Sequence, residues 1–285
     1  MKQQEFLLEN YSSFNLRDIF ECGQCFRWNK EEDGSYTGIF KNNVINVKQE
    51  NQNIIFSGNC SGNIKEICIE YFDLNANYEE IKGRLSKIDN YLKNSIEYGN
   101  GIRILKQDLW ETLISFIISA NNNIPRIKTI IERISKAYGD KIEFRRKDYY
   151  TFPTPEKLKK VGIDDFRNLG LGFRDIRVYE TVGKTLRNEI DLNKLEKEES
   201  VETLREKLLE IPGVGPKVAD CVMLFALKKY EAFPVDVWVR RVISELYFDN
   251  QEQKPKKIQE FAKKQYGNLA GLAQQYLFYW RRDIA

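Results

Sequence analysis

Histidine is absent from the 285-residue sequence. It is the side chain that most often acts as a general base near neutral pH, and it is the commonest protein ligand for metals. Its absence excludes Ser-His-Asp triads, Cys-His dyads and zinc sites built on imidazole. Catalytic chemistry in this chain must therefore rest on carboxylates, lysine, tyrosine or cysteine.

Cysteine is also scarce, with five residues in the chain. Cys22 and Cys25 form the C-x-x-C pair "CGQC", a spacing found in redox centres and in halves of zinc sites. Cys60 and Cys68 follow at a different spacing, and "CGQC" runs into "FRWNK", which has a strand pattern rather than a helix start. The pattern favours small structural residues over a redox pair.

The sequence contains no apolar run near the roughly 20 residues of a membrane span. Its start, "MKQQEFLLENYSSF", lacks the basic-then-apolar pattern of a secretion signal. The net charge of +3 is too weak to indicate nucleic acid binding by itself. We therefore expect a soluble, cytoplasmic protein with no membrane partner.

The pattern of the sequence changes near residue 78. Residues 24–58 hold short aromatic or β-branched runs between turn-forming stretches, which predicts an antiparallel meander. Later apolar residues recur at helical intervals. We predict an α+β fold, with a small antiparallel β-sheet domain at 1–98 and a large all-helical region at 99–285. Asp108 is expected to cap an apolar helix, and further helices are expected at 156–160, 175–188, 201–210, 217–229, 237–247, 254–266 and 268–281.

Residues 203–229, which include "EIPGVGPKVADC", read as a helix, a tight turn and a second helix. A phosphate-binding loop would need G-x-x-x-x-G-K-[ST] after a strand, so that interpretation fails. A helix-hairpin-helix fits instead, with Pro216 at the start of its second helix. The N–H groups of Gly213 and Gly215 are then placed to bind a DNA phosphate without reading bases. Such a turn also occurs in DNA-binding modules without catalysis.

Two residues near the hairpin have both a structural and a chemical interpretation. Lys217 is either a solvated lysine at a helix start or a reactive amine. Asp236, in "FPVDVW", stands where the next helix begins, so it is a helix N-cap, a carboxylate directed into a cleft, or both. Taken alone, Lys217 favours the structural interpretation.

The stretches "LEIPGVGPKVADC" and "FPVDVW" resemble the helix-hairpin-helix base-excision glycosylases. Further stretches are similar to the 8-oxoguanine DNA glycosylase branch, so the resemblance covers nearly the whole chain: "GQCFRW", "ISANNNIPRI", "LGLGFRDIRV" and "AQQYLF". Only Cys221 follows Cys68, which excludes the four-cysteine iron–sulfur motif usual in endonuclease III and the adenine-mismatch glycosylases. Alkyl-base glycosylases resemble this architecture but lack the hairpin lysine, which is present here as Lys217.

The resemblance implies a bifunctional DNA glycosylase/AP lyase for base-excision repair. Lys217, with its pKa lowered by burial, nearby positive charge and the helix N-terminus, would attack the deoxyribose and expel 8-oxoguanine. The resulting Schiff base would allow β-elimination of the 3′ phosphate. Asp236 would stabilise the positive charge that develops on the sugar. The lysine is thus expected to be the nucleophile and the aspartate its electrostatic partner.

The resemblance also implies how the lesion is recognised after it leaves the stack. Phe278 would stack on the purine, and Gln274 would form hydrogen bonds with its pairing edge. Cys221 would also contact the lesion base. The main-chain carbonyl of Gly23 would accept the N7 hydrogen that distinguishes 8-oxoguanine from guanine. Ordinary helix packing and a solvated amide are the alternatives for Phe278 and Gln274.

Contacts to the remaining DNA follow from the same resemblance. Asn121 would fill the hole in the duplex, and Arg126 and Arg174 would read the orphaned cytosine, although phosphate contact or surface charge could also account for these arginines. Phe173 stands at the wedge, where many relatives have tyrosine. Trp238 stands where many have a phosphate-contacting histidine. These two departures put cytosine selectivity and local phosphate binding in question.

No cofactor is expected to be required, although a monovalent cation at the hairpin is implied, held by the main chain of Leu209, Ile211 and Val214. The expected partner is double-stranded DNA containing 8-oxoguanine, and the expected protein is a bacterial-like, nucleoid-associated monomer. Two alternatives stay open. One is a glycosylase for another damaged base, such as an alkylated one, and the other is a non-catalytic helix-hairpin-helix protein.

Overall fold

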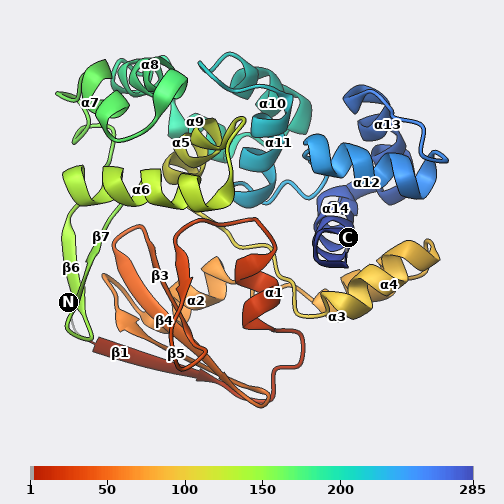
Figure 1. Ribbon diagram of the computed structural model, residues 1–285. Coiled ribbons are helices and arrows are strands. Elements are labelled where there is room, and N and C mark those ends of the chain that lie inside the picture. Colours follow the sequence, from red (N-terminus) through yellow and green to blue (C-terminus); the bar gives the residue numbers. More distant parts are fainter. Residues whose placement is uncertain (1–2, 285) are drawn as a thin grey trace.

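The computed structural model describes residues 3–284 and contains a five-stranded antiparallel sheet followed by a helical region (Figure 1). The predicted α+β fold is confirmed. The expected meander is also present, but the sequence analysis missed the edge strand β1, which pairs with β5. The strand order is β1 (Gln3–Leu8), β5 (Asn53–Asn59), β4 (Asn43–Glu50), β3 (Tyr36–Phe40) and β2 (Trp28–Lys30).

Two helices cover the sheet, α1 (Leu16–Glu21) and α2 (Ile64–Tyr71). Aromatic side chains dominate the core between them. Phe56 and Phe72 lie with their ring centroids 5.1 Å apart, and the Trp28 indole donates a hydrogen bond to the Tyr71 hydroxyl. Aromatic and β-branched side chains fit a half-buried pleated surface, which explains why these segments form strands.

The helical region packs around one large apolar core. Its helices, in chain order, are α3 (Tyr78–Leu85), α4 (Asn90–Tyr98), α5 (Leu109–Ser119), α6 (Ile124–Tyr138), α7 (Ile163–Asn168), α8 (Asp175–Leu186), α9 (Leu192–Lys197), α10 (Val201–Leu209), α11 (Pro216–Phe225), α12 (Val237–Tyr247), α13 (Pro255–Tyr266) and α14 (Ala270–Ile284), with the 3₁₀ turns η1 (Gly172–Arg174) and η2 (Gly267–Leu269). Helices α3 and α4 precede residue 99, yet their side chains belong to this core, and α4 packs on α14.

The expected helix at 156–160 was wrong. That segment forms successive turns, and α7 begins only at Ile163. Pro155 precedes it and Leu158 is its one buried side chain, so there is little apolar surface to offset the cost of nucleating a helix. The sequence analysis also missed a β-hairpin, β6 (Lys141–Phe144) and β7 (Lys147–Tyr150), within the helical region.

Helix α5 lies at the centre of the helical region. Nine of its eleven residues are buried, and Asp108 caps it as expected by accepting a hydrogen bond from the Glu111 N–H at 2.9 Å. A helix that is apolar on nearly all sides needs partners on all sides. It packs against α6, α8, α9 and α11, and its C-terminal end delivers Ser119 to the cleft described below.

Arg103 joins the sheet domain to the helical region. Its side chain is fully buried and donates hydrogen bonds to the main-chain oxygens of Ser13 and Phe72, among others. Its guanidinium also lies 4.1 Å from the centre of the Tyr78 ring. These contacts come from both sides of the interface, so one side chain fixes the two parts relative to each other.

Arg103→Met keeps much of the side-chain volume but leaves several buried carbonyl oxygens without a donor. We expect it to lower the free energy of unfolding by roughly 3 kcal/mol, measured by urea denaturation. The exposed Arg84→Met is the matched control and should change stability by less than about 0.5 kcal/mol. Equal effects of the two substitutions would contradict this role for Arg103.

Candidate active site

Lys217 lies at the start of α11. Gly215 is the N-cap of that helix and Pro216 its first residue, so the lysine stands in the first turn, near the positive end of the helix. Its Nζ lies 4.9 Å from the centre of the Phe116 ring and donates a hydrogen bond to Ser119 Oγ at 3.4 Å. The amine is therefore held against the end of α5 rather than extended into solvent.

Asp236 is the N-cap of α12, and its Oδ1 accepts a hydrogen bond from the Val239 N–H at 2.8 Å. The expected capping role is confirmed. The same residue lines a cleft of about 520 Å³ together with Lys217. A cap holds a carboxylate rigidly, so the two interpretations of Asp236 hold together.

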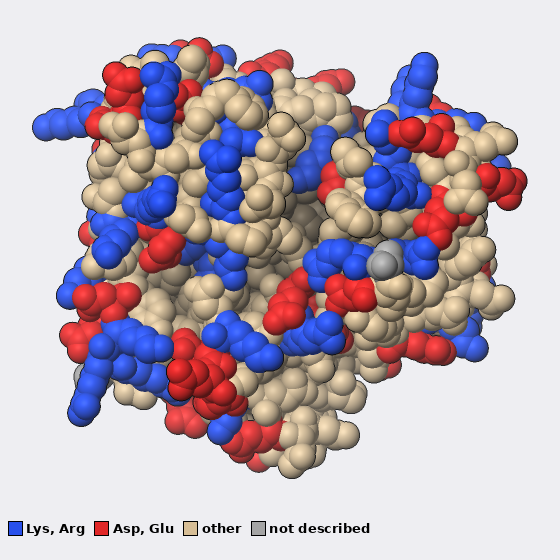
Figure 2. All heavy atoms as spheres, viewed as in Figure 1, with Lys and Arg blue, Asp and Glu red and all other residues tan. Residues whose placement is uncertain are grey.

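The cleft brings together segments that are far apart in the sequence. Six of the residues expected at the site line it: Gly23, Asn121, Lys217, Asp236, Trp238 and Phe278. In the face drawn in Figure 2, basic and acidic side chains alternate, and the surface is hollowed where α6, α11 and α12 approach one another. The mixture of both signs agrees with the weak net charge of +3.

Gly23 has a φ of +88°, a left-handed conformation that favours glycine, and a Cβ built there would lie 3.3 Å from Phe278 Cε1. The loop is anchored by Gln24, which is fully buried. The Gln24 side-chain amide bonds the main chain of Ile19, Arg103 and Leu105. Gln24 was not identified from the sequence, although it belongs to "GQCFRW". Its bonds fix the position of the Gly23 carbonyl.

Cys221 and Gln274 are buried and do not line the cleft. Burial raises the pKa of the Cys221 thiol to about 12, so it is protonated at neutral pH and is no nucleophile. All five cysteines are buried and unpaired, which agrees with a packing role for "CGQC". Gln274 accepts a hydrogen bond through its Oε1 from its neighbour Gln275.

The residues expected to contact the duplex gather beside the cleft. Asn121, with a φ of +50°, follows α5, and Phe173 is 56 % exposed. Arg174 is 2 % exposed and bonds the carbonyls of Ala120 and Asn121, with its guanidinium 4.2 Å from the centre of the Phe173 ring. Arg174 therefore braces the Asn121 loop, and its contact with cytosine stays a prediction.

Arg126 is exposed, and its guanidinium donates to the Gly170 carbonyl at 3.4 Å. Trp238 is 46 % exposed in the first turn of α12, at the mouth of the cleft. Its ring centre lies 5.2 Å from the Arg241 guanidinium. An exposed indole beside a cation offers a stacking surface instead of the point contact a histidine would make.

Two glycines and a hydrogen bond between main-chain groups shape the hairpin turn between α10 and α11. Gly213 has a φ of +82°, and a Cβ there would lie 2.8 Å from Arg177 Cδ, so glycine is required by conformation and by space. A Cβ at Gly215 would meet no atom within 4 Å. The Ile211 carbonyl accepts from the Val214 N–H at 3.0 Å, so the oxygen is directed into the turn.

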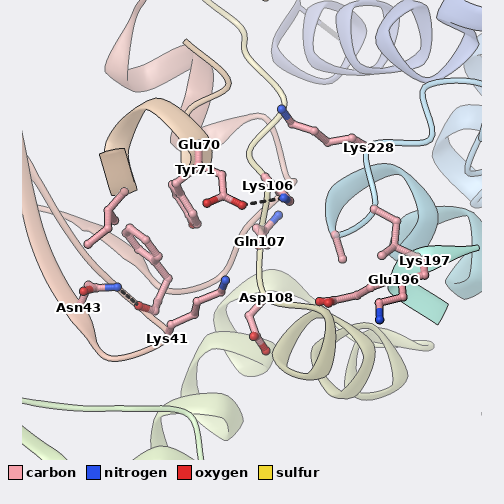
Figure 3. Close-up of a pocket in the computed structure, with 14 residues that line it drawn as sticks. Lys41, Asn43, Glu70, Tyr71, Lys106, Gln107, Asp108, Glu196, Lys197 and Lys228 are labelled. Atoms are coloured by element: carbon pink, nitrogen blue, oxygen red, sulfur yellow. Dashed lines mark hydrogen bonds and ion pairs between the residues drawn. The ribbon is translucent and has the colours of Figure 1, made fainter. Parts of the chain in front are cut away.

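A second cavity, of about 490 Å³, lies between the sheet domain and the helical region at the opposite end of α5 (Figure 3). Two of the four lysines that line it are paired with acids. Lys106 pairs with Glu70 at 2.6 Å, and Lys228 pairs with Asp73. Its Asp108 is the cap of α5, and none of its lysines stands in the first turn of a helix as Lys217 does.

Family models match both parts of the chain. The N-terminal domain of 8-oxoguanine DNA glycosylase matches residues 6–113, and the HhH-GPD superfamily of base excision DNA repair proteins matches residues 114–267. The chain belongs to the 8-oxoguanine DNA glycosylase family. Of the residues described, no helix is both long and apolar enough to cross a membrane.

Members of the family with curated names or solved structures are similar over most of their length. A probable N-glycosylase/DNA lyase of Methanothermobacter thermautotrophicus is 34 % identical over 74 % of this chain and 72 % of its own. The N-glycosylase/DNA lyase OGG1 of Arabidopsis thaliana is 31 % identical, over 94 % and 77 %. The Clostridium acetobutylicum 8-oxoguanine glycosylase/lyase, solved with double-stranded DNA containing cytosine opposite 8-oxoG, is 42 % identical with a TM-score of 0.94, over 100 % and 98 %.

The close approach of Gly23 to Phe278 leads to a direct test. Gly23→Ala should slow excision of a base that stacks on Phe278 by at least tenfold, because the new methyl group meets the ring at 3.3 Å. Gly34→Ala is the matched control, since Gly34 has a similar φ of +83° but no neighbour within 4 Å. Both variants should lose about 1 kcal/mol of stability from backbone strain. Equal excision rates would refute the close-contact argument.

Proposed function

We propose that this member of the family removes 8-oxoguanine from double-stranded DNA and then cleaves the strand as an AP lyase. The observation that carries the proposal is the placement of Lys217 and Asp236. Each stands at the start of a helix, and both line one cleft with Gly23 and Phe278. The names of the similar proteins support the same activity.

The reaction begins with the neutral amine of Lys217. Its lone pair forms a bond to C1′ of the flipped nucleotide while the C1′–N9 bond breaks, and the electron pair leaves with the base, which then takes up a proton. The sugar carries oxocarbenium character during this step, and the Asp236 carboxylate stabilises it. Opening of the sugar ring gives the Schiff base, and loss of a C2′ proton expels the 3′ phosphate.

The lesion pocket is assigned to Phe278, Gln274, Gly23 and Cys221. The phenyl ring stacks on the purine, and the Gly23 carbonyl accepts the N7 hydrogen that guanine lacks. Gln274 bonds the pairing edge, and the protonated Cys221, one turn after Lys217 on α11, supplies an apolar wall. The fixed Gly23 loop and the placement of Phe278 in the cleft support the roles of these two residues, and the resemblance to the family carries those of Gln274 and Cys221.

The opposite strand is assigned to the residues beside the cleft. Asn121 fills the vacated position, and Phe173 wedges the duplex. Arg126 and Arg174 read the orphaned cytosine. Gly213 and Gly215 bind a backbone phosphate through their N–H groups. Trp238 packs on the substrate backbone at the cleft mouth.

The resemblance to the family carries the proposal of a monovalent cation at the hairpin, held by the main-chain carbonyls of Leu209, Ile211 and Val214, since hard cations prefer oxygen ligands. Such an ion would fix the turn that binds the phosphate. The reaction itself uses only the side chains named above. We also infer that the chain acts as a monomer, since Lys217, Asp236 and Phe278 line one cleft without a residue from a second copy.

Lys217→Gln keeps length and polarity but removes the amine, and it should abolish excision and strand cleavage while DNA binding survives. Asp236→Asn keeps most of the cap and should slow excision by well over tenfold, more than the roughly 1 kcal/mol that capping accounts for. Single-turnover excision, binding and melting temperature check these expectations. Lys160→Gln, at an exposed site, is the control. Full activity of Lys217→Gln would reject the assignment.

The opposite base provides a separate test. Excision of 8-oxoguanine should be fastest opposite cytosine, whose orphaned edge offers acceptors to Arg126. Arg126→Ala should reduce the ratio of the rates opposite cytosine and adenine by roughly 5- to 100-fold, since one good arginine–base contact is worth about 1–3 kcal/mol. A wild-type preference for adenine would show that the arginine assignment is wrong.

A further inference from the structure

The last turn of α5 presents two groups to the Lys217 amine. Lys217 Nζ lies 4.9 Å from the centre of the Phe116 ring and 3.4 Å from Ser119 Oγ. Residues three apart lie on one face of a helix, so the ring and the hydroxyl meet the amine from the same face of α5. The Phe116 ring is itself fixed, because it is buried and stacks on Phe225 with the ring centroids 5.6 Å apart. The amine therefore lies against a rigid surface.

The hydrogen of the Ser119 hydroxyl is used within α5 itself. Ser119 Oγ lies 2.8 Å from the Phe116 carbonyl oxygen, and because a carbonyl carries no hydrogen, the hydroxyl is the donor of this bond. In a continued α-helix the Ala120 N–H would bond that carbonyl, but here it bonds the Ile117 carbonyl instead. The hydroxyl thus supplies the donor that the end of the helix lacks, and only its lone pairs remain for Lys217.

The bond to the Phe116 carbonyl decides the direction of the bond between the serine and the lysine. With its hydrogen engaged, Ser119 accepts and Lys217 donates, whether the amine is protonated or neutral. A neutral amine has two N–H groups and one lone pair, so a donated N–H leaves the lone pair unused. A serine with a free hydrogen would instead donate to the neutral amine and occupy the electron pair that the reaction needs.

We propose that Ser119 is a positioning residue for the nucleophile, which holds one N–H of Lys217 and leaves the lone pair free to attack C1′. The inference rests on the proposed function, in which Lys217 is the nucleophile. Because Ser119 acts through the amine, it serves attack on a damaged nucleotide and on an abasic sugar alike. On the abasic sugar, Nζ bonds C1′ of the open aldehyde, and the aldehyde oxygen leaves as water with one amine hydrogen and one proton from solvent. The protonated Schiff base that results keeps one hydrogen on Nζ for Ser119.

The test uses two duplexes that differ only in carrying 8-oxoguanine or an abasic site opposite cytosine. In Ser119→Ala, single-turnover excision from the first and borohydride trapping on the second should both slow about tenfold or more, because the reacting amine loses its orientation. Affinity for a duplex with tetrahydrofuran at that position, which forms no Schiff base, should be unchanged. Ser119→Thr restores a hydroxyl that also bonds a carbonyl three or four residues back in a helix, and it should recover most of both rates.

Ser95→Ala is the matched control. The Ser95 hydroxyl donates to the Leu92 carbonyl at 2.9 Å, the same kind of bond within α4, and no lysine among residues 3–284 bonds it. It should lower the melting temperature about as much as Ser119→Ala does and leave both rates unchanged. Unchanged rates in Ser119→Ala, slowing of excision alone, or no recovery in Ser119→Thr would overturn the role of Ser119. Failure of the proposed function is distinct, because the wild-type protein would then leave 8-oxoguanine in place.

Discussion

Two helix N-termini, those of α11 and α12, open into the same cleft, and the chemistry of the site depends on that convergence. Lys217 stands in the first turn of α11, beside the positive end of that helix. The start of α12 holds the Asp236 carboxylate, which is engaged as a cap and cannot swing away. The Lys217 amine and the fixed Asp236 carboxylate thus line the same cleft. They supply the reactive groups in a chain that has no histidine.

The surrounding structure keeps these two helix ends in place. Asp220, fully buried on α11, pairs with Arg205 on α10 and accepts from Gln259 on α13, and burial raises its pKa to about 7. Arg174 holds the loop after α5 through the carbonyls of Ala120 and Asn121. Rigid support of this kind lets a lysine and an aspartate act without reorganisation during the reaction.

Local sequence rules predicted the hairpin, the strands of the meander and the caps Asp108 and Asp236, because turns and caps depend on nearby residues. They failed at 156–160, where burial decides whether a short charged segment becomes helical. They also missed Gln24, whose role depends on partners brought close by the fold. Nothing in "GQCFRW" shows which groups the Gln24 amide bonds, so this role required the three-dimensional structure.

The measurement that tests the central claim most directly is borohydride reduction of the protein with duplex DNA containing 8-oxoguanine, followed by mass spectrometry of the trapped peptide. A Schiff base between enzyme and sugar is reduced to a stable covalent bond, so the modified residue identifies the nucleophile. We expect one adduct per protein, on the peptide that contains Lys217. An adduct on another lysine, or none while the base is released, would contradict the account.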